Sequence, residues 1–257
     1  MGVEPDSFET SEDAVLGGGL RLRQPKRGHR VGHEAILLAA ATGGRAGERA
    51  ADLGAGIGGA GLALAVRVTG LDVTLIEIDP ALCALASGNA LLNGLESRAR
   101  AVCADVADLA GLVAAGLAQG GFDRVLMNPP FNDARRQNVS PDPNRRLAHV
   151  ATPGLLPGWV AAAGWLLKPE GVLTLIWRAD GLTEVLEALG GEFGSVGVLP
   201  VYPREGAPPI RALVRAVKGG QASRIDYPDL ILNDEQGKPT AAVEAVLRGG
   251  ETLKIAD

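Results

Sequence analysis

Residues 49–68, RAADLGAGIGGAGLALAVRV, join a short apolar strand through a glycine-rich turn to an apolar helix. Within this stretch, residues 54–59 read GAGIGG and satisfy the pattern G-x-G-x-x-G. Glycines at these positions let the backbone turn sharply and pass close beneath a bound nucleotide-like group. The pattern alone is a weak signal, but its place between a strand and a helix predicts the ligand-binding edge of an α/β sheet.

The rest of the chain continues this alternation of strands and helices. We expect further strands at 73–78, 99–103, 122–127, 172–177, 195–199 and 210–217. We expect helices at 33–41, 60–68, 80–93, 106–118, 157–167, 182–189 and 241–247. Such alternation predicts an α/β fold with a mostly parallel sheet and helices on both faces. The glycine-rich, basic stretch before residue 30 predicts a small hairpin.

The bulk composition fits one α/β domain with additions. The 257 residues are 46% hydrophobic but only 4% aromatic, which indicates a core of alanine, leucine, valine and glycine. No apolar run reaches the roughly 18 residues of a membrane-spanning helix, and the acidic first residues lack the apolar core of a signal peptide. Cys83 and Cys103 lie in apolar stretches, so we expect two buried thiols and no metal framework. The natural inference is a cytoplasmic protein.

Acidic residues stand at the ends of successive expected strands. Asp52 precedes the glycine loop, where it would repel a pyrophosphate but tolerate a cationic cofactor such as S-adenosyl-L-methionine. Glu77 ends the second strand, where an acid can bind both hydroxyls of a ribose. Asp79, followed by proline, indicates the start of a helix. Asp105 follows the third strand and either accepts from an adenine amino group or caps a helix.

The fourth expected strand ends within residues 122–131, FDRVLMNPPF. Two consecutive prolines cannot continue a ladder, so the strand stops and presents an amide, a carbonyl and a ring at the sheet edge. The side-chain oxygen of Asn128 and the carbonyl of Pro129 could accept both N–H bonds of a conjugated amino group and direct its lone pair outward. Phe131 could stack on a planar substrate. The alternative is a proline-rich turn in which Asn128 satisfies local backbone groups.

Basic residues gather in two groups, although the formal net charge is −5. The first group lies between residues 20 and 30. The second follows the two prolines and comprises Arg135, Arg136, Arg145 and Arg146. Both groups are either solvated surface or a surface that holds phosphates. His149 is assigned to the surface and the tryptophans to packing, although Trp159 follows the second group closely.

Four motifs, in this order, resemble the class I S-adenosylmethionine-dependent methyltransferases: DLGAGIG at 52–58, IEID at 76–79, AD at 104–105 and NPPF at 128–131. The NPPF variety is similar to enzymes that methylate exocyclic or amide nitrogens. Residues 24–38, QPKRGHRVGHEAILL, resemble the bacterial tRNA(adenine-N6)-methyltransferase group that modifies valine tRNA beside the anticodon. Glu34 departs from the aspartate expected in that stretch.

This resemblance implies a seven-stranded sheet in the order 3-2-1-4-5-7-6, with the seventh strand antiparallel. It also implies an N-terminal extension at 1–42 that closes the site, a methyltransferase domain at 43–218 and a C-terminal extension at 219–257. The reaction would be in-line transfer of the sulfonium methyl to the nitrogen held by Asn128 and Pro129. Such a transfer needs no metal and no general base.

The same resemblance assigns roles to individual residues. The catalytic set is Asn128, Pro129 and Phe131. The cofactor-binding set is Arg30, Gly32, Asp52, Gly54, Gly56, Gly58, Glu77, Ile78, Asp105, Val106 and Asn128. The RNA-binding set, with tRNA as the partner, is Lys26, Arg27, Arg135, Arg136, Arg145 and Arg146.

Other functions compete with adenine N6 methylation of tRNA. A protein glutamine amide offers the same acceptor geometry without a nucleic-acid surface, and guanine N2 in RNA is another amino acceptor. The basic flanks of the site favour RNA modestly. In a different class, a cofactor-binding module without catalysis would have no need of an intact NPPF segment.

Overall fold

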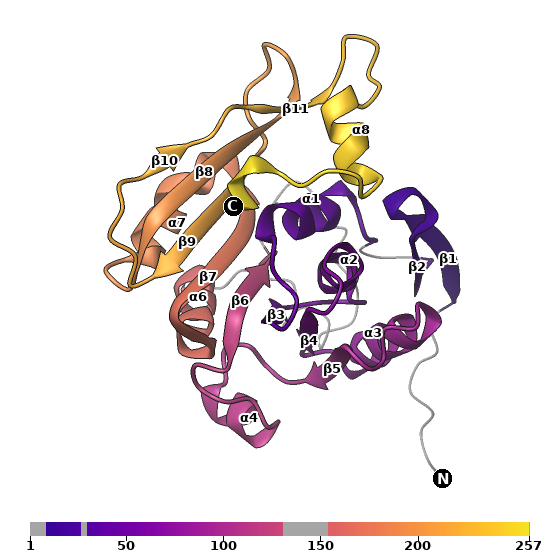
Figure 1. The fold of residues 1–257 in the computed structure, drawn as a ribbon, viewed down its shortest axis with the longest axis vertical. Helices are drawn as coiled ribbons and strands as arrows, with labels where there is room; N and C mark the ends of the chain where they lie inside the picture. Colours follow the sequence, from indigo (N-terminus) through magenta and orange to yellow (C-terminus); the bar gives the residue numbers. More distant parts are fainter. Residues whose placement is uncertain (1–8, 27–29, 131–153, 257) are drawn as a thin grey trace, which may run out of the picture.

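The computed structural model describes residues 9–26, 30–130 and 154–256, which form a two-stranded hairpin and a nine-stranded sheet flanked by helices (Figure 1). The main strands of the large sheet are β3 (Arg49–Leu53), β4 (Asp72–Glu77), β5 (Ala99–Cys103), β6 (Phe122–Met127), β7 (Leu167–Arg178), β8 (Phe193–Arg204) and β9 (Arg211–Lys218). Two short strands, β10 (Ile225–Asp226) and β11 (Leu230–Asn233), both pair with β8.

The order of the main strands is β5-β4-β3-β6-β7-β9-β8, which confirms the expected order 3-2-1-4-5-7-6. β9 is antiparallel to both of its neighbours, while the pairs from β5 to β7 are parallel. β10 and β11 extend the sheet beyond the seven expected strands. They are two and four residues long, which is too short for an alternating pattern to be recognised in the sequence.

Helices on the two faces of the sheet bury two apolar cores. α1 (His33–Thr42), α2 (Gly59–Arg67) and α3 (Pro80–Leu92) cover one face, and α4 (Leu109–Ala114), α6 (Leu155–Leu166) and α7 (Leu182–Leu189) cover the other. β6 serves both cores, because Leu126 packs in the first while Val125 and Met127 pack in the second. All three side chains are fully buried. The central strands are therefore covered on both sides, as parallel sheets generally are.

Two segments outside the main strands pack against the first face. β1 (Thr10–Val15) and β2 (Leu20–Pro25) pair antiparallel and form the expected hairpin, whose inner side packs against α2 and α3. α8 (Ala241–Leu247) and the turn at Lys254–Ala256 lie beside α1 (Figure 1). The backbone N–H of Leu253 donates to the carbonyl of Ala40 at 3.1 Å. The hairpin and the segment from α8 to Ala256 thus brace the helices next to the glycine loop.

The helix expected at 106–118 is shorter in the structure and covers only Leu109–Ala114. The chain before it is held in a turn, because the Asp105 carboxylate accepts from the backbone N–H of Ala107 at 2.8 Å. Gly116, with a φ of 79°, ends the helical path soon after Ala114. Asp105 and Gly116 are the sequence signals that mark these shorter limits.

The expectation that both cysteines are buried is wrong for Cys103, which is exposed at the end of β5. β5 is the outermost strand on its side of the sheet, so fewer elements cover it. Cys83 is buried, and its burial, together with the nearby Cys103 thiol, raises its thiol pKa to about 11.

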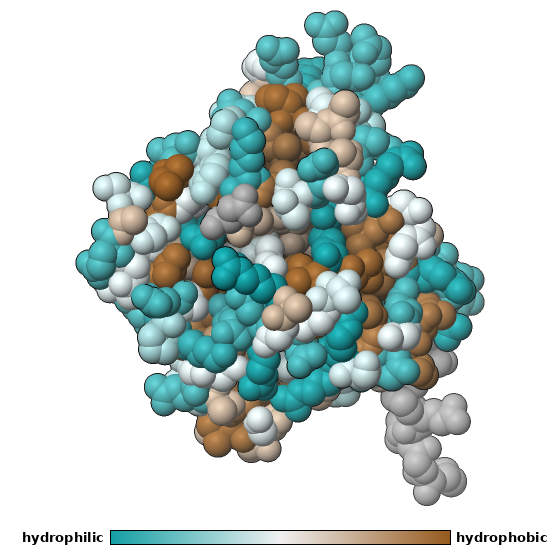
Figure 2. Space-filling model, in the orientation of Figure 1, coloured by the Kyte–Doolittle hydropathy of each residue, from teal (hydrophilic) through white to brown (hydrophobic). Residues whose placement is uncertain are grey.

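Figure 2 shows polar residues over most of one face and an apolar area over α4, where Leu109 and Val113 are exposed. Among the helices of the described ranges, none combines the length and the hydropathy needed to cross a membrane.

Candidate functional site

The carboxyl ends of β3, β4 and β6 bring the sequence motifs to one edge of the sheet. The three strands are parallel, and Leu53 at the end of β3 lies opposite Ile76 of β4 and Met127 of β6. The residues that follow these positions are Gly54, Glu77 and Asn128. The strands therefore gather the glycine loop, an acid and an amide at the edge where open α/β sheets hold ligands.

The glycine loop needs glycine at each of its alternate positions. Gly54, Gly56 and Gly58 have φ values of 67°, 57° and 88°, in the left-handed region that other residues rarely adopt. The loop is closed by a hydrogen bond of 2.8 Å from the N–H of Gly58 to the carbonyl of Ala55. α2 begins directly afterwards, at Gly59. The loop is open at its middle glycine, because a Cβ added to Gly56 would meet nothing within 4 Å.

Asp52 lies beneath the loop and is only 3% exposed. Its Oδ2 accepts from the backbone N–H of Gly61 at 2.8 Å, within the first turn of α2. Burial, with a smaller contribution from the charge of Glu77, raises the pKa of the Asp52 carboxyl to about 7. Near neutral pH this carboxyl is poised between its neutral and ionised forms.

Glu77 braces the glycine loop from the neighbouring strand. Its Oε2 accepts from the N–H of Gly56 at 2.7 Å, and its Oε1 accepts from the N–H of Asp79 at 2.9 Å. Each carboxylate oxygen can accept a second hydrogen bond, so Glu77 could still accept hydrogen bonds from a ligand. Asp79 caps α3 by accepting from Ala81 N–H, which agrees with its expected role at the start of that helix. Ile78, between the two acids, is 51% exposed and offers an apolar side at the same edge.

Asp105 and Val106 follow β5 at the far side of the edge. Asp105 is exposed and accepts from the N–H of Ala107, so it forms a turn and does not cap α4. Val106 is 4% exposed and packs in the second core. Both residues therefore lie where the sequence put them, after the third strand of the sheet.

Asn128 holds an acceptor atom without a partner. Its Oδ1 is buried and makes no hydrogen bond within the described residues. An unsatisfied buried oxygen costs roughly 1–3 kcal/mol, so such an atom at a sheet edge points to a donor supplied from outside the chain. Pro129, the next residue, is buried. Within the described residues, the absence of a bond to Oδ1 disfavours the alternative in which this atom satisfies the turn.

Trp159 of α6 is a further residue of this edge. A Cβ placed on Gly54 would lie 2.4 Å from Cη2 of the Trp159 ring, so the indole packs directly on the first glycine of the loop. The ring is half-buried and also packs against the second core. From the sequence, Trp159 was expected to be a packing residue, and the only sign of a further role was its position soon after the second basic group.

Charged residues before and at the start of α1 form ion pairs within the protein. Arg30 donates to the Asp13 carboxylate at 2.6 Å, and Lys26 pairs with Glu9 at 3.5 Å. Glu34 accepts from Nε of Arg211, on β9, at 2.6 Å. Gly32 precedes the first residue of α1. The acids of β1 and its flank thus compensate the charges of these two bases.

The remaining site candidates lie outside the described residues. They are Arg27, Phe131, Arg135, Arg136, Arg145 and Arg146, together with the surface candidate His149.

Residues 32–200 match the methyltransferase small domain family. A release factor glutamine methyltransferase from Chlorobaculum tepidum is 34% identical over 157 residues, which are 59% of this chain and 52% of that protein. A tRNA1(Val) (adenine(37)-N6)-methyltransferase from Porphyromonas gingivalis is 31% identical over 160 residues, 61% of each chain. The chain thus spans only about half to three fifths of the length of these curated relatives. Among solved structures, a protein from Agrobacterium tumefaciens described as a predicted O-methyltransferase is 30% identical, with a TM-score of 0.73, covering 86% of this chain and 98% of that one.

Proposed function

The chain belongs to the methyltransferase small domain family, whose cofactor is S-adenosylmethionine, and we propose that it methylates the exocyclic N6 of an adenine in tRNA. The observation that carries this proposal is the unpartnered Oδ1 of Asn128, next to the glycine loop at the carboxyl edge of the sheet. An amino group conjugated to a purine offers two N–H donors, and Asn128 with the Pro129 carbonyl offers two acceptors for them.

The residues at the edge fit the cofactor chemically. S-adenosylmethionine supplies a methyl group already activated by its positive sulfur, and it carries no phosphate. The Gly54–Gly58 loop would lie beneath it, Glu77 would hold its ribose and Ile78 would flank its base. The Asp52 carboxyl, whose pKa is about 7, would be drawn toward its ionised form by the cationic groups of the donor. Arg30 and Gly32 belong to the same proposed seat, and Asp105 and Val106 would face the adenine.

The residues of this chain would position the acceptor nitrogen and stabilise the charge that develops on it during methyl transfer. Asn128 and Pro129 would hold the amino nitrogen and favour a pyramidal geometry with its lone pair toward the methyl donor. Trp159, and by the motif Phe131, would offer flat apolar surfaces to a planar acceptor. The nitrogen loses its surplus proton to water after the methyl bond has formed, so no residue is assigned as a general base.

A glutamine amide of a protein is the second candidate acceptor, because the relative from Chlorobaculum tepidum is named for that reaction. Both reactions use an NH₂ group on a planar, conjugated carbon. The tRNA acceptor is supported by the relative from Porphyromonas gingivalis and by the four arginines that follow the proline pair. RNA binding through those arginines would weaken steeply with salt. Guanine N2 in RNA would fit the same acceptors less selectively.

We further propose that residues 1–42 close the site over a methyltransferase domain at 43–218, and that 219–257 brace it from behind. Work on tRNA would place the protein in the cytoplasm.

The proposal is tested by incubating the purified protein with radiolabelled S-adenosylmethionine and, in parallel, with total tRNA, total RNA and total protein. We expect label in tRNA, as N6-methyladenosine on nucleoside analysis. Label in glutamine of a protein fraction would assign the second candidate, and label as N2-methylguanosine would reassign the base. Label on oxygen, or in none of the fractions, would refute the assignment. Replacing Arg135, Arg136, Arg145 and Arg146 with alanine should weaken tRNA binding and flatten its salt dependence.

A further inference from the structure

Asn89 of α3 is fully buried and joins two segments that are distant in the sequence. Its Oδ1 accepts from the backbone N–H of Arg23, on β2, at 2.7 Å. Its Nδ2 donates to the carbonyl of Arg23 and to the carbonyl of Ile57, both at 3.0 Å. One side-chain amide therefore holds the hairpin and the glycine loop together.

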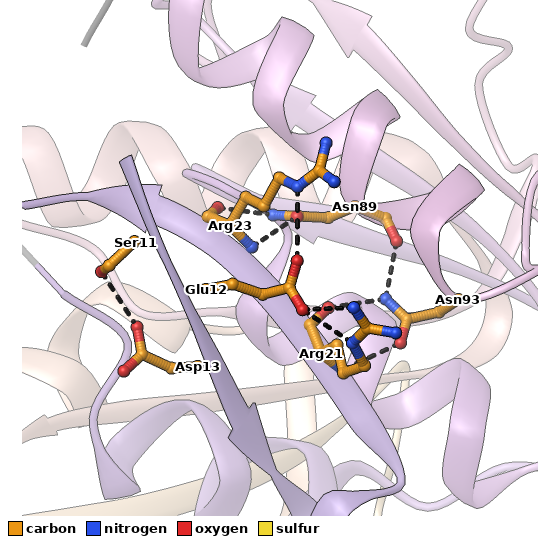
Figure 3. A network of polar contacts seen from close by, with 7 residues as sticks. All are labelled: Ser11, Glu12, Asp13, Arg21, Arg23, Asn89 and Asn93. Atoms are coloured by element: carbon orange, nitrogen blue, oxygen red, sulfur yellow. Dashed lines mark hydrogen bonds and ion pairs between the residues drawn. The ribbon is translucent and has the colours of Figure 1, made fainter. Parts of the chain in front are cut away.

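The same helix carries a second asparagine, which binds the hairpin but not the glycine loop. Asn93, one turn later, accepts from the N–H of Arg21 at 2.8 Å and donates to its carbonyl at 2.7 Å. Its other contact is the carbonyl of Asn89, and it reaches no residue of the loop. Figure 3 shows both amides lying along β2, beside the ion pair of Arg21 and Glu12. The two asparagines replace a neighbouring strand along this edge of the hairpin.

Ile57 lies in the middle of the glycine loop. It stands between Gly56 and Gly58, both in the left-handed region. A chain with glycine on both sides has little intrinsic preference for one conformation. The bond from Asn89 supplies a fixed anchor in the middle of this permissive stretch.

A second path connects the hairpin to the end of the loop. Gln24 is 4% exposed, and its Oε1 accepts from the backbone N–H of Val31 at 2.9 Å. The Val31 side chain fills the space over Gly59, where an added Cβ would lie 2.6 Å from it. β2 is thus tied to both halves of the loop, through Asn89 at Ile57 and through Val31 at Gly59.

We propose that Asn89 is a positioning residue that fixes the Ile57 carbonyl and couples docking of the β1–β2 hairpin to cofactor affinity. The inference rests on the proposed seat of S-adenosylmethionine over the glycine loop. Because coupling between two sites is reciprocal, a bound cofactor must also tighten the hairpin.

The first test compares Asn89→Ala with Asn93→Ala, which serves as the matched control. Both variants lose two hydrogen bonds to β2, but only Asn89→Ala loses the bond to Ile57. Calorimetric titration with S-adenosylhomocysteine should show about tenfold weaker binding for Asn89→Ala and less than about threefold for Asn93→Ala. The KM for the donor should rise in parallel while kcat at saturation changes little. Equal affinities of the two variants would overturn the coupling.

Asn89→Asp separates the two functions of the amide. While ionised, its carboxylate still accepts from the N–H of Arg23 but cannot donate to the carbonyls of Arg23 and Ile57, so its cofactor affinity at alkaline pH should match that of Asn89→Ala. Affinity equal to wild type would refute the role of the Ile57 bond.

A hydrogen-exchange measurement on the wild type covers the case in which these variants do not fold. S-adenosylhomocysteine should slow exchange of the Arg21 and Arg23 amides severalfold, although neither residue is assigned to the cofactor seat. Unchanged exchange in a protein that binds the ligand would overturn the inference alone. Failure of the wild type to bind the ligand would overturn the proposed seat and the inference with it.

Discussion

The indole of Trp159 lies against the Cα of Gly54, so close that a methyl group on residue 54 would come within 2.4 Å of the ring. This contact joins α6, on one face of the sheet, to the first residue of the glycine loop. It also places a large aromatic side chain beside the proposed point of methyl transfer. The contact explains why residue 54 must be glycine for reasons of space as well as backbone conformation.

Gly54→Ala should therefore be more damaging than Gly56→Ala. Both positions have positive φ, but an added Cβ on Gly56 meets nothing within 4 Å. Backbone strain costs each variant about 1–2 kcal/mol of unfolding free energy, and Gly54→Ala carries the clash with Trp159 in addition. Urea denaturation of Gly54→Ala, Gly56→Ala, Trp159→Ala and Gly54→Ala/Trp159→Ala measures the difference. If Gly54→Ala costs as much in the Trp159→Ala protein as in the wild type, the clash does not account for the cost.

Trp159 should report cofactor binding through its fluorescence. Adding S-adenosylhomocysteine should change the emission of the wild type and of Trp165→Phe, but not that of Trp159→Phe. Trp165 lies on the same helix, about 9 Å further along its axis, and serves as the control. A retained change in Trp159→Phe would place the responding tryptophan elsewhere.

Asp52 should make the stability of the protein depend on pH. Its folded pKa is about 7, raised from 3.8, so the folded state binds a proton that the unfolded state releases between these values. The contribution of this proton to stability is full below pH 4 and is lost as the pH rises through 7. From pH 5 to pH 8 the unfolding free energy of the wild type should fall by about 2–3 kcal/mol relative to Asp52→Asn.

Asp52→Asn is a suitable comparison because its side-chain oxygen can still accept from Gly61. Urea denaturation of both proteins at matched pH values gives the difference. Parallel pH profiles would show that Asp52 titrates with an ordinary pKa in the folded protein.

Asn128→Ala should remove methyl transfer while leaving cofactor affinity within about threefold of wild type. The side chain is expected to hold the acceptor nitrogen, so its loss acts on kcat by a factor of about 100 or more. Single-turnover transfer to tRNA and equilibrium dialysis with labelled S-adenosylhomocysteine measure the two quantities. Undiminished turnover would remove Asn128 from the mechanism.

The features that the sequence predicted correctly are those that depend only on residues adjacent in the chain. The strand before Gly54, the glycine loop and the cap at Asp79 each depend on neighbouring residues, and the structure agrees with all three. The strand order came from resemblance to a known fold and is confirmed. Asn89 carries no such local signal, because its importance lies in contacts 32 and 66 residues away.

Electrostatic partners were also hidden from the sequence. The basic stretch before residue 30 was expected to be either solvated surface or a phosphate-binding surface, and in the structure Arg21 and Arg23 pair with Glu12 across the hairpin. Pairing of that kind depends on strand register, which sets Glu12 opposite Arg23. The sequence likewise shows Asp52 as an acid near the loop. It does not show that its carboxyl accepts a hydrogen bond from Gly61 of α2 or that burial raises its pKa to about 7.

The hydrogen bonds from the Asn89 and Asn93 side chains to β2 affect how readily this protein aggregates at high concentration. An outer strand with free N–H and C=O groups invites strands from other molecules to add to it, and such addition seeds insoluble assemblies. Here the backbone N–H and C=O groups of Arg21 and Arg23 are already hydrogen-bonded to the side chains of Asn93 and Asn89. This edge of β2 is thereby closed to strand addition, and a variant lacking either asparagine should precipitate at lower protein concentration than the wild type.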